Sequence, residues 1–409
     1  MKKIGILTFH RSINTGAFMQ CYGLVNQLQK DFPDCEIRVI DYETKTAHLN
    51  YSSNLLTYLK NGLSFSGVKN KIKSCFIFTI RFLSLVFLHP HRLKDRRNNL
   101  KIFKYALNYL PLTDFSIVSD DCDELYELIK KEFDVVIVGS DCVWQYVGYP
   151  FPNAYLLNFD GEIVKLSYAA CAYRIDLSKM SDDNKTILSK AICSLNYIGI
   201  RDEQTKRIVE NLEINKPFFH NCDPAFFVDL SKLPIIKENI KAKMLSAGID
   251  FSKPIIGLQL RNRNISKRIK KTFGNDYCYV AIRERNNFAD FFMENLSPFE
   301  WALIFSFFTF TITDYFHATL FSIKNEVCPI VFDNKTGFYN GEISRVEDLM
   351  KRMKLENCYV CYTNGQEQNI NYKGIALNAS QINIKDFKKR INQEVDSYAS
   401  FKNFLKDCI

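Results

Sequence analysis

Short apolar segments alternate with segments of helical periodicity along most of this 409-residue chain, and this alternation restricts the fold more than any other feature. Residues 4–9 predict a strand, residues 17–30 an amphipathic helix, and residues 36–41 a second strand. A strand, a crossover helix and another strand in this order form a unit with parallel strands. The chain therefore opens as an α/β protein with a parallel sheet.

The same alternation continues and then begins a second round. Further strands are predicted at 134–138, 165–170, 197–201 and 218–228, and a second series at 254–260, 277–282, 308–313 and 327–332. We therefore expect two Rossmann-like domains that face a cleft, over residues 1–230 and 231–409. The first carries a mostly helical insertion at about 45–115, and residues 383–406 form a C-terminal helix in the second.

Composition excludes several classes of protein. The chain is 47% hydrophobic and 24% charged, as globular proteins are, so disorder, collagen and coiled coil do not describe it. Its net charge is +9, but the basic residues form no known nucleic-acid-binding motif, and we expect no nucleic-acid partner. The thirteen cysteines lack a pattern of paired metal ligands, so we expect no metal site and reduced thiols in the cytoplasm.

One basic and apolar segment, residues 75–97, has two interpretations. Residues 75–88 are apolar except for Arg81 and are flanked by lysines and arginines. Fourteen residues cannot span a bilayer, which needs about 20. The segment is either a buried helix or an interfacial helix at an anionic membrane surface. The short apolar start of the chain predicts a core strand and not a signal peptide, so the expected location is cytoplasmic, with peripheral contact at the inner membrane face as an option.

Polar residues gather directly after five predicted strands, where ligands bind in parallel sheets. These residues are His10, Asn14 and Gly16; Ser140, Asp141 and Trp144; Arg201, Asp202 and Glu203; Arg261, Asn262 and Arg263; and Asp314, Tyr315, Phe316 and His317. The chain has no dinucleotide-binding, P-loop, zinc-protease or esterase motif.

Each of the main candidates has a functional and a structural interpretation. His317 stands at a predicted helix start, which attracts anions, with Asp314 as a possible N-cap; it can donate a proton or contact a phosphate, or it can simply cap the helix. Arg201 offers a fork-shaped donor for a carboxylate or phosphate, or forms an ion pair. Asp141 and Trp144 could bind a sugar, or form a tight turn with a packed ring.

Seven blocks of sequence carry a resemblance. In chain order they are KIGILTFHRSINTGAFMQCYGL, DVVIVGSDCVW, KLSYAACAY, IGIRDEQT, NCDPAFF, TITDYFHATLFSI and SRVEDLMKRMKLEN. Together they span residues 3 to 357 and resemble the polysaccharide pyruvyl transferase family. Residues 45–115 are the part that the resemblance covers least.

The resemblance implies a fold similar to that of GT-B glycosyltransferases, with the acceptor on the N-terminal side and the donor on the C-terminal side. It implies phosphoenolpyruvate as the donor, as a co-substrate with no further cofactor. The implied acceptor is a sugar of a cell-surface polysaccharide such as a capsule, often lipid-linked. The product would be a pyruvate ketal across two sugar hydroxyls, with release of phosphate.

In this family an arginine and a histidine of two blocks contact the donor, and the matching residues are Arg201 and His317. The family often has a basic residue two positions before that histidine, where this chain has Tyr315. Many members also have Gln and Asn near the Trp of the GSD block, where this chain has Cys142 and Gln145.

For the implied reaction we assign His317 as the acid or phosphate contact, Arg201 as the main donor anchor and Asp141 as the base or acceptor-hydroxyl ligand. Other expected donor contacts are Phe316, Arg345 and Arg261, and other expected acceptor contacts are Asn14, Gly16 and Trp144. Two other functions fit the sequence. One is a GT-B glycosyltransferase that uses a nucleotide sugar, and the other is a non-catalytic protein that binds carbohydrate or membrane.

Overall fold

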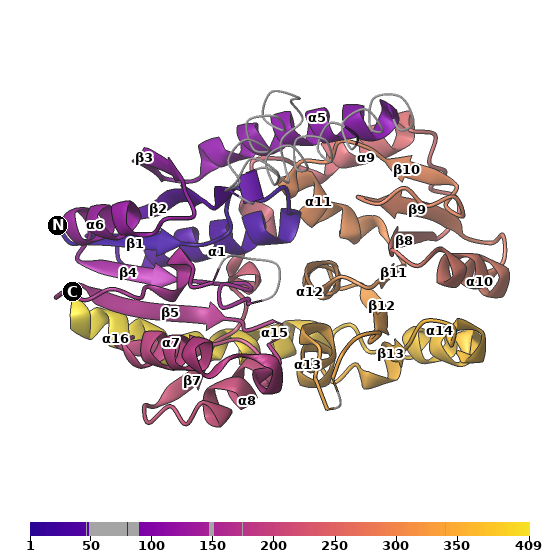
Figure 1. The fold of residues 1–409 in the computed structure, drawn as a ribbon. Coiled ribbons are helices and arrows are strands. Elements are labelled where there is room, and N and C mark those ends of the chain that lie inside the picture. Colours follow the sequence, from indigo (N-terminus) through magenta and orange to yellow (C-terminus); the bar gives the residue numbers. More distant parts are fainter. Residues whose placement is uncertain (46, 49–79, 81–89, 147–150, 174, 340) are drawn as a thin grey trace.

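Two parallel sheets form the framework of the protein. The computed structural model describes residues 1–45, 47–48, 80, 90–146, 151–173, 175–339 and 341–409. Within these residues the two sheets lie side by side with helices packed around each of them (Figure 1). The prediction of an α/β protein with two Rossmann-like domains is therefore confirmed.

The first sheet has seven strands in the order β3-β2-β1-β4-β5-β6-β7. All its strand pairs are parallel, and β1 and β4 at its centre have almost entirely buried side chains. Burial on both faces explains why these strands are continuous apolar runs in the sequence. The strands are β1 (Lys3–Leu7), β2 (Glu36–Glu43), β3 (Leu112–Val118), β4 (Val135–Val138), β5 (Val164–Ala170), β6 (Tyr197–Ile200) and β7 (Phe218–His220).

The second sheet has six parallel strands in the order β10-β9-β8-β11-β12-β13. In both sheets the strand order reverses at one place, between β1 and β4 and between β8 and β11. Such a reversal leaves a crevice at the carboxyl ends of the strands. The strands are β8 (Ile255–Gln259), β9 (Cys278–Ile282), β10 (Phe291–Met293), β11 (Phe310–Thr313), β12 (Cys328–Asn334) and β13 (Tyr359–Tyr362).

Helices cover the sheets and join the two domains. One cluster of buried apolar residues continues from the first sheet, through α1 and α11, into the second sheet. The helices are α1 (Thr15–Asp31), α5 (Pro90–Ala106), α6 (Asp123–Glu132), α7 (Asp182–Cys193), α8 (Glu203–Asn211), α9 (Lys237–Ser246), α10 (Arg263–Phe273), α11 (Pro298–Ile304), α12 (Phe316–Lys324), α13 (Arg345–Arg352), α14 (Tyr372–Ser380), α15 (Asp386–Asp396) and α16 (Tyr398–Cys408).

The C-terminal segment differs from its prediction in two ways. It forms two helices, α15 and α16, with Ser397 between them. It also returns to the first domain, although the predicted domain 231–409 includes it (Figure 1). Phe401 packs against Tyr168 and Tyr197 of the first sheet, and Lys402 lies 2.7 Å from Asp31. Sequence periodicity identifies the apolar face of a helix but not the surface that the face covers.

Two predicted boundaries are also wrong. Residues 112–118 are the edge strand β3, so the insertion at 45–115 ends before this strand. The predicted strand 218–228 stops after three residues as β7, and residues 224–227 form a 3-10 helix that begins at Pro224. The apolar segment 75–88 lies outside the described residues except for position 80. Beyond it, α5 reaches the second domain, where its Asp95 lies 3.2 Å from Arg285.

The described cysteines are all free thiols. No helix in the described part of the chain has both the length and the apolar character needed to cross a bilayer.

Candidate active site between the two domains

A cavity of about 420 Å³ lies between the carboxyl ends of the two sheets. We call it the His317 cavity. Residues that follow β1, β4 and β5 line it from the first domain, and residues that follow β9 and β11 line it from the second. The lining residues used below are Asn14, Gly16, Asp141, Cys142, Tyr173, Arg283, Glu284, Tyr315, Phe316, His317 and Arg345.

The first domain contributes the start of α1 to this cavity. Asn14 caps that helix, since its Oδ1 accepts a hydrogen bond from the backbone N–H of Gly16 at 3.0 Å. Gly16 packs directly against the imidazole of His317 from the second domain. A Cβ atom on Gly16 would lie 2.0 Å from Nδ1 of His317. The expected positions of Asn14 and Gly16 at the cleft therefore agree with the cavity lining.

The second domain contributes the start of α12. Tyr315 is the N-cap residue, and its side chain makes no capping hydrogen bond. Asp314 does not cap the helix as the sequence suggested, because its carboxylate pairs with Arg261 at 2.9 Å. The first turn of α12 thus presents backbone N–H groups and the positive end of the helix dipole at His317.

Asp223 connects the arginine and the histidine that the sequence singled out. Its Oδ2 lies 2.8 Å from Nη1 of Arg201 and 3.5 Å from Nε2 of His317. Asp223 is almost completely buried. Burial disfavours its charged form, but the neighbouring imidazole of His317 and guanidinium of Arg201 outweigh burial and lower the pKa of Asp223.

Arg201 lies behind the cavity and not in its wall. Its side chain is 0% exposed, its guanidinium lies 4.8 Å from the centre of the Phe316 ring, and Asp141 and Asp223 lie within 3.5 Å. The phenyl ring and the carboxylates surround the guanidinium. This arrangement therefore argues against the predicted direct contact between Arg201 and a donor. Its Nε nonetheless has no hydrogen-bond partner among the described residues.

Asp141 joins the two domains through a second arginine. Its Oδ1 lies 3.0 Å from Nη1 of Arg345, the first residue of α13, and 3.5 Å from Nη2 of Arg201. Burial raises the pKa of Asp141, but the two guanidinium charges outweigh it and hold the pKa well below its usual range. A carboxylate held this strongly as an anion is a poor proton acceptor, which argues against the predicted role of Asp141 as a base.

Two predicted site residues lie elsewhere. Trp144 is 1% exposed and packs in the core of the first domain, so its ring is not available to stack on a sugar. Arg261 lines an adjoining cavity, where its guanidinium covers the ring of Tyr315 at 4.6 Å.

Three residues that line or support the cavity were missed. Asp223 follows β7 as the other candidates follow their strands, but the predicted strand ran on to residue 228 and concealed it. Arg283 follows β9 directly, and the same rule would have found it. Tyr173 follows β5 and lies against Arg345, with the guanidinium 4.6 Å from its ring centre. Among the described residues, no three His, Cys, Asp or Glu side chains are placed to hold a metal ion.

Solved structures with a similar fold include two UDP-GlcNAc 2-epimerases. The enzyme from Neisseria meningitidis, bound to UDP-GlcNAc, has a TM-score of 0.55 and 12% identity over 99% of this chain and 100% of that chain. The enzyme from Methanocaldococcus jannaschii, in complex with UDP-GlcNAc and UDP, has a TM-score of 0.52 and 14% identity over 96% of this chain and 99% of that chain. At these identities the likeness shows the GT-B-like fold alone.

No curated protein sequence is similar enough to this chain to count as a match. A family model, however, matches residues 14–336, which include the strands from β2 to β12 and most of the site. The model describes polysaccharide pyruvyl transferases. Its match extends over most of the chain and over both walls of the His317 cavity. The chain therefore belongs to the polysaccharide pyruvyl transferase family and is an enzyme of that kind, for which phosphoenolpyruvate is the general donor and a polysaccharide the general acceptor.

Proposed function

We propose that this protein transfers the pyruvyl group of phosphoenolpyruvate to two hydroxyls of one sugar unit in a cell-surface polysaccharide precursor. One observation supports this proposal above the others. Arg201 and His317, which the family resemblance marks as donor contacts, share one oxygen of Asp223 at the edge of a cavity between the domains. His317 also stands at the uncapped start of α12, where a phosphate or carboxylate is stabilised.

The reaction divides into steps that these side chains can serve. A proton adds to the methylene carbon of phosphoenolpyruvate and leaves an oxocarbenium-like centre at C2. One sugar hydroxyl adds to C2 and the bond from C2 to the phosphate oxygen breaks. The second hydroxyl then adds and closes the ketal. One hydroxyl proton balances the proton added to carbon, and the other leaves with hydrogen phosphate.

We assign His317 as the proton donor or phosphate contact and the first turn of α12 as the anion-binding group. Arg345 lines the cavity and acts as the second cationic contact. Arg201 acts from behind the wall, where it holds Asp141 and Asp223 as carboxylates. Asp141 positions Arg345, and Asp223 positions the imidazole of His317. These assignments place the charge-bearing groups at the donor before the reaction starts, which is the arrangement that lowers a barrier most.

The test is phosphate release from phosphoenolpyruvate with a panel of diol-containing oligosaccharides, together with mass spectrometry for the added pyruvyl group. His317→Ala should remove about 2–4 kcal/mol of transition-state stabilisation, which is measured from the decrease in kcat/KM. His220→Ala is the matched control, since His220 also lies beside a carboxylate, that of Glu394 at 3.7 Å, but outside the cavity. Unchanged turnover in His317→Ala would contradict the site assignment. Transfer from a nucleotide sugar in place of phosphoenolpyruvate would favour a glycosyltransferase.

We further propose that the acceptor is lipid-linked and that the enzyme works at the cytoplasmic membrane surface. The sequence of residues 75–97, apolar at its centre and basic at its flanks, supports this proposal. A charge in the apolar part, as in Leu85→Asp, should slow turnover of a lipid-linked acceptor in anionic vesicles and leave a water-soluble acceptor unaffected. Equal rates for both acceptors in the variant would contradict the proposal.

A further inference from the structure

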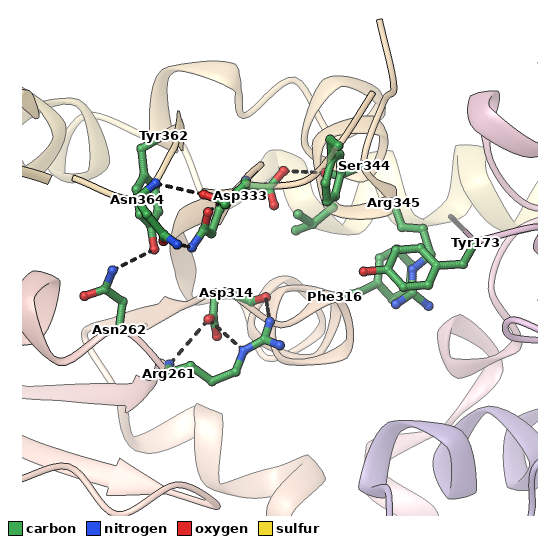
Figure 2. Close-up of a pocket in the computed structure, with 14 residues that line it drawn as sticks. Tyr173, Arg261, Asn262, Asp314, Phe316, Asp333, Ser344, Arg345, Tyr362 and Asn364 are labelled. Atoms are coloured by element: carbon green, nitrogen blue, oxygen red, sulfur yellow. Dashed lines mark hydrogen bonds and ion pairs between the residues drawn. The ribbon is translucent and has the colours of Figure 1, made fainter. Parts of the chain in front are cut away.

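A second cavity, of about 490 Å³, adjoins the His317 cavity on the side of the second domain. We call it the Arg261 cavity, and Figure 2 shows its lining. It lies at the carboxyl ends of β8, β11, β12 and β13, so four strands of the second sheet contribute to it. The two cavities share Tyr173, Phe316 and Arg345. A ligand that fills one therefore approaches a ligand in the other at these three side chains.

The charges in the lining of the Arg261 cavity are already balanced. Its described ionisable residues, apart from tyrosine, are two arginines and two aspartates. Arg261 pairs with Asp314 at 2.9 Å, and Arg345 pairs with Asp141 at 3.0 Å. The carboxylate of Asp333 accepts hydrogen bonds from the hydroxyls of Ser344 and Tyr359 (Figure 2 shows the first of these). An anion that binds Arg261 in this cavity would compete with Asp314 for the guanidinium, whereas a neutral ligand leaves that pair in place.

The starts of α10 and α13 at this cavity are capped by side chains of the same domain. Asn262 caps α10 by accepting from the backbone N–H of Asn264 at 3.0 Å. Ser344 caps α13 by accepting from the backbone N–H of Glu347 at 3.0 Å. A helix start binds anions through N–H groups that have no such partner. The start of α12 has no side-chain cap, and it lies where the two cavities meet, since its first residue, Phe316, lines both.

The remaining groups in the lining suit a polyhydroxylated ligand. Amides and hydroxyls gather here from three strand ends, and bonds between them hold them in place: Nδ2 of Asn334 donates to Oδ1 of Asn364 at 2.8 Å, and Nδ2 of Asn262 donates to the hydroxyl of Tyr362 at 3.1 Å. Amides and hydroxyls both donate and accept, as the hydroxyls of a sugar do. The rings of Tyr173 and Phe338 add apolar faces to the same lining.

We infer that the Arg261 cavity binds a neutral sugar unit of the acceptor, next to the anionic donor in the His317 cavity. The inference rests on the proposed pyruvyl transfer and adds to it the second domain as an acceptor subsite. It also gives Arg345 and Phe316 a position between the two substrates. The acceptor would then contact both domains, whereas the sequence alone placed its contacts in the first domain.

The experiment measures binding without turnover on the full chain. Saturation-transfer NMR with neutral galactose-containing oligosaccharides should detect their contact with the protein. Thr336 is an exposed residue of the Arg261 cavity lining, and Thr336→Trp should raise the apparent Kd at least about tenfold because the larger side chain occupies the cavity. Thr309→Trp is the matched control, an exposed threonine of the same domain just before β11, at the opposite end of that strand. The wild-type Tm in both variants confirms that they fold.

A second pair of variants identifies the charge of the ligand. A neutral sugar should bind Thr336→Asp and Thr336→Lys with similar affinity, whereas an anion such as UDP should prefer the lysine variant. Weakening of UDP binding by Thr336→Trp, with oligosaccharide binding unchanged, would overturn the inference. If oligosaccharides bind as expected but phosphoenolpyruvate is never consumed, the proposed reaction fails and the sugar subsite stands.

Discussion

Gly16 and His317 meet across the domain interface so closely that position 16 has no room for a side chain. A Cβ atom there would lie 2.0 Å from Nδ1 and 2.2 Å from Cγ of the imidazole. Gly16 belongs to the first turn of α1 and His317 to the first turn of α12. The missing side chain therefore fixes how near the first domain can approach the proposed proton donor.

Gly16→Ala should displace the imidazole and lower turnover at least about tenfold, because shifts near 1 Å at a reacting group can cost about 10²-fold. The steric effect should disappear only when the whole side chain at position 317 is absent, because Cβ of His317 would lie 2.6 Å from the added atom. The double variant with His317→Gly should thus be no slower than His317→Gly alone, and kcat measured for all four proteins gives this comparison. Wild-type turnover in Gly16→Ala would show that the imidazole position is not critical.

Asp223→Asn should retain the fold and lower kcat at least about tenfold, since the amide keeps the shape of the side chain but removes the charge beside His317. The kcat profile against pH should also change, which a purely structural effect would not produce. Asp229→Asn is a close control. Both aspartates cap a 3-10 helix through the backbone N–H two residues later, but Asp229 lies outside the cavity. Equal activity of the two variants would argue against a positioning role for Asp223.

Arg201→Met should destabilise the protein by about 3–5 kcal/mol, because it leaves buried carboxylates without their counter-charge. The free energy of unfolding in urea measures this loss. Arg207→Met, in the following helix α8, removes an exposed guanidinium 3.7 Å from Glu203 and should cost no more than about 1 kcal/mol. A similarly small loss in both variants would mean that the buried cluster contributes little to stability.

Stability should fall in acid because of Asp141 and Asp223. Both carboxyls have a lowered pKa in the folded protein, so the folded state binds fewer protons than the unfolded state. In the unfolded state the aspartates titrate at about pH 3.9. Their contribution is complete above about pH 5 and decreases as the pH falls toward the folded pKa values. Asp223→Asn should therefore reduce the slope of unfolding free energy between about pH 5 and pH 3. Identical slopes would contradict the lowered pKa of Asp223.

The sequence was sufficient to predict the features that depend on residues close together in the chain, which are the buried strands and the polar residues that follow them. Apolar runs such as 135–138 and 255–259 identify buried parallel strands, because both faces of such strands are covered. The strand-end rule located His317, Asp141, Asn14 and Gly16, since the carboxyl ends of parallel strands meet at one edge of a sheet. The ordered blocks indicated the family, which the matched family model confirms.

Only the tertiary structure decided which of these residues meet, and how. Arg201 follows its strand as the other candidates do, yet it is buried behind Phe316. Trp144 also follows its strand, yet its ring lies in the core of the first domain. Asp223 becomes part of the site because β7 ends early, and α16 returns to the first domain through a surface that periodicity does not specify. Periodicity determines which side of an element is buried. The partner on that side, and the charges that surround a buried group, come from segments far away in the chain.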